Sequence, residues 1–141
     1  MSFTSCIPQL AKPLIIMAIL FVPGCARWVR EPPGPSYKKF SELVHFPDFY
    51  PGLGTLYVQP ATMPYGPFKG YDRRGILADT IYMIPIEDIN KHDTIAMLEG
   101  TALPVDHVEI YFNSGHAGLD VPHYHIVLYH VSHEEQAKYL H

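Results

Sequence analysis

Two segments near the C-terminal end of the chain alternate between aliphatic and polar or aromatic side chains. In residues 106–112, Val108 and Ile110 alternate with His107, Glu109 and Tyr111, and residues 123–131 follow the same rule. A period of two places successive side chains on opposite faces of a β-strand. The linking segment, 113–122, is rich in residues that favour turns. The pattern predicts two neighbouring antiparallel strands.

The rest of the chain predicts short strands and short helices. With 14 Pro and 10 Tyr in 141 residues, long helices are disfavoured. Further strands are expected at 55–59 and 76–84. Short helices are expected at 38–45, within 86–99 with Asp93 capping 94–99, and from Ser132 onward, where Glu135 completes a capping box. The predicted fold class is α+β: a mostly antiparallel sheet with two or three short helices, in one small domain.

Charge and motifs exclude several classes of protein. The net charge is −4 and no basic run is present, so a nucleic-acid-binding protein is not expected. The sequence contains no Gly-x-Ser-x-Gly, no P-loop and no dinucleotide-binding fingerprint.

The N-terminus predicts export. An apolar run of ten residues, 13–22, would form a helix of about 15 Å, about half the thickness of a bilayer core. That is the length of the apolar part of a secretory signal. The run leads into Val22-Pro23-Gly24-Cys25, which resembles the lipobox of bacterial lipoproteins.

The lipobox resemblance implies removal of residues 1–24 as a signal peptide and a covalent lipid on Cys25. An ordinary signal peptide and an uncleaved apolar anchor remain as alternatives. Residues 25–37 contain Pro32, Pro33 and Pro35 and are predicted to be a Pro-rich tether. Residues 38–141 would then form the globular domain, held by its lipid on the periplasmic or cell-surface side of a bacterial membrane.

Histidines are concentrated in the two alternating segments, with six of nine between residues 107 and 133. We expect Glu109 to pair with His125, Tyr111 with His123 and His107 with Val127. This register gathers the polar side chains on one face, and the glycines around His116 let that residue fold over it. The opposite, aliphatic face is expected to be buried, with these members: Val108, Ile110, Ile126 and Leu128.

Imidazoles beside a carboxylate are ligands for transition metals. The sequence therefore predicts a site for Zn, Cu, Fe or Mn. Its candidate ligands are His107, Glu109, His116, His123 and His125. The alternative is a solvated sheet face on which histidine is only a polar residue.

Two further resemblances bear on function. Gly115-His116, Pro122-His123-Tyr124-His125 and the segment 132–138 resemble a group of exported bacterial proteins of unknown function. That resemblance implies an α+β fold and a His-lined site, and no reaction.

The His-x-His pair also resembles the cupin metal motif, but Tyr129 and His130 stand where that motif has its Glu.

The expected function is therefore an exported lipoprotein whose domain binds a transition metal or a small ligand at a His-rich sheet face. One alternative is a non-catalytic accessory subunit that docks on a membrane protein complex through the aromatic and Pro-rich stretch 47–71. The other is a small cupin-like metalloenzyme.

Overall fold

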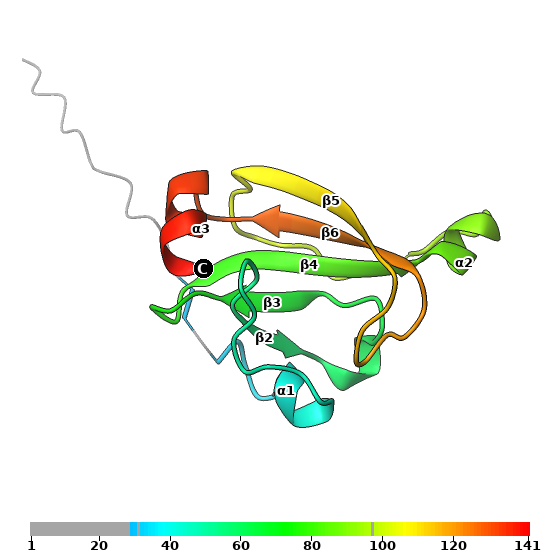
Figure 1. Cartoon of the computed structure of the whole chain (residues 1–141), viewed down its shortest axis with the longest axis horizontal. Coiled ribbons are helices and arrows are strands. Elements are labelled where there is room, and N and C mark those ends of the chain that lie inside the picture. Colours follow the sequence, from blue (N-terminus) through cyan, green and yellow to red (C-terminus); the bar gives the residue numbers. More distant parts are fainter. Residues whose placement is uncertain (1–28, 31, 97) are drawn as a thin grey trace, which may run out of the picture.

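A computed structural model describes residues 29–30, 32–96 and 98–141. Within them the chain forms an antiparallel six-stranded sheet of order β1-β2-β3-β4-β6-β5, with three short α-helices and one 3-10 helix (Figure 1). The strands are β1 (Lys38–Lys39), β2 (Thr55–Val58), β3 (Phe68–Tyr71), β4 (Leu77–Pro85), β5 (His107–Asn113) and β6 (His123–Tyr129). The helices are α1 (Phe40–Leu43), η1 (Pro60–Thr62), α2 (Ile86–Asn90) and α3 (His133–Tyr139). The predicted α+β class is confirmed.

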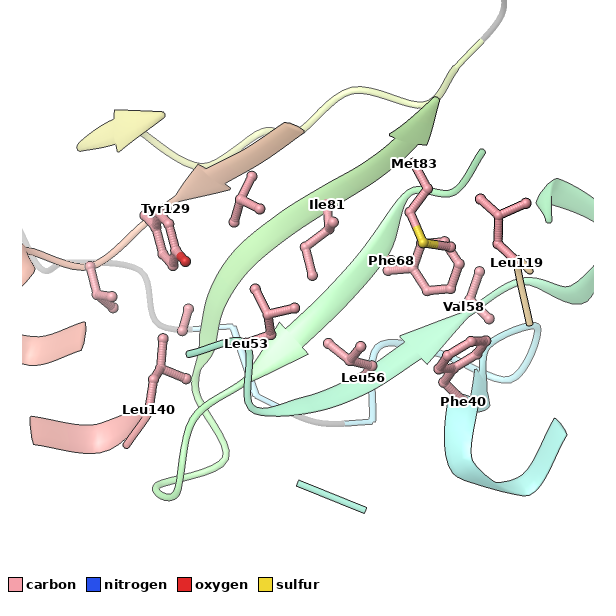
Figure 2. Close-up of a cluster of buried hydrophobic side chains, with 13 residues drawn as sticks. Phe40, Leu53, Leu56, Val58, Phe68, Ile81, Met83, Leu119, Tyr129 and Leu140 are labelled. Carbon is pink, nitrogen blue, oxygen red and sulfur yellow. The ribbon is translucent and has the colours of Figure 1, made fainter. Parts of the chain in front are cut away.

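The core lies against one face of this sheet, which we call the inner face. Side chains of β2, β3, β4 and β6 point toward it, and Phe40 of α1, Leu53, Leu119 and Leu140 cover it (Figure 2). The buried cluster comprises Phe40, Leu53, Leu56, Val58, Phe68, Ala78, Ile81, Met83, Leu119, Val127, Tyr129, Val131 and Leu140. Residues that the sequence places far apart therefore share one core.

The β5–β6 hairpin buries the face opposite to the one we expected. Val108 and Ile110 are 50% and 64% exposed, whereas His123 and His125 are 0% and 5% exposed. The expected burial of Val108 and Ile110 is wrong, and Ile126 and Leu128 are only half-buried. The histidine face is the inner face because it turns toward α1, Leu119 and the rest of the core, and tertiary packing decides which face of a strand is buried.

The register of the hairpin also differs from the expected one, by two residues. Tyr111 pairs with His125 and Asn113 with His123, while Glu109 faces Val127 and His107 faces Tyr129. A slip of two leaves every side chain on its predicted face, so alternation alone cannot distinguish the two registers. Pairing with β4, which sets Ile81 opposite Val127, contributes to the choice.

The helix predicted from Ser132 onward is confirmed, and the helix predicted at 94–99 is wrong. Ser132 caps α3, accepting a hydrogen bond from the Glu135 N–H at 3.3 Å. No helix forms at 94–99 in the described part of that segment. There the Glu99 carboxylate contacts Tyr37 Oη at 3.2 Å and Lys69 Nζ at 3.3 Å, and such contacts outweigh the weak helical preference of a six-residue segment.

The N-terminal features predicted at 1–24 and at Cys25 lie outside the described residues. Of the stretch predicted as a tether, Val29 accepts a hydrogen bond from Leu77 N–H at 2.8 Å, Arg30 bridges to Ile76, and Tyr37 is buried. The described residues contain no helix of the length and apolar character needed to cross a membrane.

Candidate metal centre

Three histidines converge at one end of the hairpin: His116, His123 and His125. The Nε2 atom of His125 lies 2.9 Å from that of His123 and 3.3 Å from that of His116. Each ring offers one nitrogen as a ligand atom, and these three nitrogens all lie within 4.8 Å of one another. His123 and His125 are two positions apart on β6 and so share its inner face.

His116 reaches the cluster because the loop between β5 and β6 closes on itself. His116 and Leu119 exchange backbone hydrogen bonds at 2.9 and 3.0 Å, and the buried Leu119 fixes this turn to the core. Gly118 has φ = +91°, and a Cβ there would stand 2.6 Å from the ring of Phe40. Glycine is therefore required at this position for the loop to lie close to α1.

Each of the three rings uses its Nδ1 atom in a second contact. His116 Nδ1 lies 2.8 Å from the Ala117 carbonyl oxygen, and His123 Nδ1 lies 2.7 Å from that of Val121. A carbonyl only accepts, so both rings carry their proton on Nδ1 and present a lone pair on Nε2. His125 Nδ1 is held by Tyr111 Oη at 3.2 Å.

Two of the three Nε2 separations are close to those of tetrahedral coordination, and the ligand atoms all lie within 4.8 Å of one another. Zinc–nitrogen bonds of about 2.0–2.1 Å imply nitrogen–nitrogen separations of about 3.3 Å along a tetrahedron edge. The two measured separations, 2.9 and 3.3 Å, lie close to that value. A single proton on His125 can bridge to one neighbouring lone pair, whereas a cation satisfies all three nitrogens together.

Burial keeps the imidazoles of His123 and His125 in the neutral form that binds metals. Desolvation lowers the pKa of His123. It lowers the pKa of His125 to about 4, and the proximity of His123 and His116 adds to the effect. Both rings are therefore uncharged at neutral pH, without competition from a proton.

The other two predicted ligands lie toward the opposite end of the hairpin. The His107 ring stacks on Tyr129 and on His133, with centroids 4.6 and 3.7 Å apart, and its Nδ1 contacts Asp106 at 2.9 Å. Glu109 Oε2 accepts a long hydrogen bond of 3.4 Å from Tyr129 Oη. Neither joins the three-histidine cluster, because the two-residue change of register moves them away from His125.

Sequence reasoning missed a cavity beside the histidines. It has a volume of about 160 Å³ and is walled mainly by apolar side chains. His116 and His125 form part of its lining. Its walls come from α1, the segment after it, five strands and the loop between β5 and β6, so no local pattern in the sequence indicates it.

Sequence reasoning also missed Asp79. This carboxylate of β4 is wholly buried on the inner face, opposite Tyr129 in the sheet. Neither of its oxygens has a hydrogen-bond partner of ordinary geometry among the described residues. Burial raises the pKa of Asp79 well above its usual value, so the group is held in its neutral form. In the sequence it stands between Ala78 and Thr80 as an ordinary polar residue of an alternating strand.

Comparison with known proteins identifies a relative of known structure. The chain is 41% identical to a hypothetical protein, TTHB210, from Thermus thermophilus, over 67% of this chain and 92% of that one, with a TM-score of 0.58. The chain belongs to the family of this Thermus protein. That relative is described as hypothetical, so the likeness carries the fold and no activity. No family model and no curated protein matches the sequence.

Proposed function

We propose that this domain binds a divalent transition-metal ion through Nε2 of His116, His123 and His125. The observation that carries the proposal is the orientation of the rings. Two of them are fixed through Nδ1 by backbone carbonyls, with their Nε2 atoms 2.9 and 3.3 Å from that of His125, and the His125 ring is held by Tyr111. Partners on the second ring nitrogen are the usual companions of metal-binding histidines.

Three neutral imidazoles favour zinc or copper over the harder ions. Three protein ligands also leave the fourth tetrahedral position open to water or a small ligand. The side chains of His123 and His125 are buried, whereas that of His116 is half-buried. Such a ligand would therefore reach the metal from the side of His116. The proposed role is therefore binding of an ion that remains accessible to a second, small molecule.

The metal proposal is tested by elemental analysis and zinc titration of the purified full chain. We expect one ion per chain, and a loss of affinity on the order of 100-fold or more in His125→Ala. His116→Ala gives a second test at a less buried position. His133→Ala is the matched control, because that ring stacks on His107 outside the cluster. A wild-type chain that takes up no stoichiometric Zn, Cu, Fe or Mn refutes the proposal.

We further propose that the chain is an exported lipoprotein, anchored through Cys25 on the outer side of a bacterial membrane. The support is the apolar run 13–22 followed by Gly24-Cys25, together with the resemblance of Gly115-His116 and 122–125 to exported bacterial proteins. We expect the Cys25→Ser variant to lose its lipid and leave the membrane fraction, or to accumulate as precursor. Unchanged mass and fractionation would contradict the anchor and leave the metal proposal standing.

A further inference from the structure

The cavity beside the metal centre has the form of a binding pocket. Its floor is made by buried apolar side chains from α1, the 44–54 segment and strands β2, β3 and β4. These are Phe40, Leu53, Leu56, Phe68, Ile81 and Met83. Figure 2 shows these side chains gathered on the inner face of the sheet. Phe46 and Tyr50, whose rings stack with centroids 5.2 Å apart, stand at the more exposed rim.

The pocket and the candidate metal centre have two side chains in common. His116 and His125 line the pocket and also belong to the three-histidine cluster. A molecule bound at the open position of the metal can therefore extend into the apolar pocket. The two features form one composite site, with a coordinating end and an apolar end.

The size of the pocket limits the apolar part of its ligand. A volume of about 160 Å³ is close to the roughly 150 Å³ of an apolar protein cavity that accommodates one benzene molecule. One six-membered ring or a chain of about six carbons therefore fills it. A larger ring system requires the walls to move.

The charge of the metal ion determines which kind of ligand group is favoured at the open coordination position. Imidazole ligands carry no charge, so a set of three leaves the double positive charge of the ion uncompensated. Neither the histidine cluster nor the pocket lining contains an Asp or Glu among the described residues. An anionic oxygen donor on the ligand supplies the missing charge in a site of low dielectric.

Asn113 is placed to receive the second oxygen of such a group. It pairs with His123 in the sheet and lines the pocket beside His116. Its Oδ1 accepts a hydrogen bond from Gly115 N–H at 2.9 Å, which directs the amide Nδ2 group to act as a donor elsewhere. A carboxylate with one oxygen on the metal can accept from Nδ2 with the other.

We infer that the composite site binds a small monocarboxylate with one apolar ring or short chain, its carboxylate on the metal and its apolar part in the pocket. This inference rests on the proposed metal binding. It names a ligand class, for which benzoate is the probe, with acetate carrying the head group alone and benzyl alcohol the ring without the charge.

The test uses the full chain loaded with Co(II), whose visible absorption reports a change of ligands. We expect benzoate to change the spectrum with a dissociation constant about 10- to 100-fold lower than that of acetate, because only benzoate buries a ring. Benzyl alcohol should leave the spectrum unchanged. Benzoate should bind His125→Ala incubated with Co(II) far more weakly than the wild type.

Two variants separate the two ends of the site. Asn113→Asp keeps the acceptor for Gly115 N–H but replaces the donor by a negative oxygen, so benzoate and acetate should both bind about tenfold more weakly. Leu56→Phe fills the pocket and should weaken benzoate selectively. If Leu56→Phe does not fold, the ratio of the benzoate and acetate affinities of the wild type still tests the apolar end, and Asn113→Asp tests the coordinating end.

The outcomes of these experiments test the carboxylate ligand class separately from the proposed metal binding. A chain that binds no Co(II), Zn or Cu refutes the metal centre itself. A chain that binds Co(II) but shows no spectral change with tens of millimolar benzoate refutes the ligand class alone. Equal affinity for acetate and benzoate, or benzoate binding that is unaffected by the loss of His125, also refutes it, because the pocket and the metal would then not act together.

Discussion

The two faces of the β5–β6 hairpin reverse the usual distribution of side chains. The inner face carries His123 and His125 and is buried, while the outer face carries Val108 and Ile110 and is exposed. Both faces belong to the same two strands and have the same regular ladder. What differs is what lies opposite them: the inner face meets α1 and the core, whereas the side chain of Ile110, on the edge strand β5, is 64% exposed.

This comparison shows that polarity does not decide which face of a two-stranded unit becomes the interior. Burial of imidazoles is unfavourable unless their nitrogens find partners. Here each Nδ1 has an oxygen partner, and the Nε2 atom of His125 contacts those of His123 and His116. A buried polar cluster of this kind points to a ligand, whereas exposed aliphatic residues on the outer face cost the fold little.

The largest expected effect contrasts an isoleucine from the core with one from the outer face. Ile81→Ala should lower the free energy of unfolding by about 2–5 kcal/mol, because Ile81 is buried against Phe68 and Val127 in the core. Ile110→Ala should cost less than about 1 kcal/mol, since its side chain is mostly exposed. Urea unfolding of both variants measures the difference. Equal costs would show that another molecule or segment covers the outer face.

The next effect contrasts two tyrosines of the same hairpin. Tyr111→Phe keeps the ring that stacks on His125 but removes the hydroxyl at 3.2 Å from its Nδ1, so metal affinity should fall about 10- to 100-fold. Tyr124→Phe, on the outer face, should leave the affinity unchanged within about twofold. Zinc titration with a chromophoric competitor measures both. Similar affinities for the two variants would exclude an orienting role for Tyr111.

The third effect concerns Asp79 and depends on pH. The folded protein holds this carboxyl protonated, and the unfolded chain releases the proton above about pH 4. Asp79 therefore makes the protein lose stability as pH rises, by at most about 1.4 kcal/mol per pH unit, until the pH passes the folded pKa. Asp79→Asn lacks this loss, so its stability relative to wild type should increase from pH 4.5 to 7.5.

Urea unfolding in the presence of a chelator measures the difference in stability between Asp79→Asn and the wild type at each pH. The lowered pKa values of His123 and His125 act in the opposite direction, because the unfolded chain takes up protons on them as pH falls from 6.5 toward about 4. Their effect is common to both proteins and cancels in the comparison. A pH-independent difference between wild type and Asp79→Asn would show that Asp79 is ionised in the folded state.

Part of the candidate site was predictable from the sequence. The pair His123 and His125 follows from a period of two, and His116 follows from the glycines around it. His107 and Glu109 were predicted as ligands, yet the structure places them with Tyr129, because registers that differ by two residues satisfy the same alternation. Tyr111 lies on the predicted face but beside His125 rather than His123 for the same reason.

The sequence by itself determined the local features of this protein: the alternating strands, the turns between them, the Ser132 cap and the grouping of histidines on one face. These depend on residues close to one another in the chain. Only the tertiary structure decided that the histidine face is the buried one, that the described part of 94–99 is not helical, and that a pocket opens beside His125. The buried face and the pocket depend on Phe40, Leu119 and β4, and the 94–99 segment depends on the contacts of Glu99 with Tyr37 and Lys69. Contacts between such distant segments are set by the packing of the whole fold.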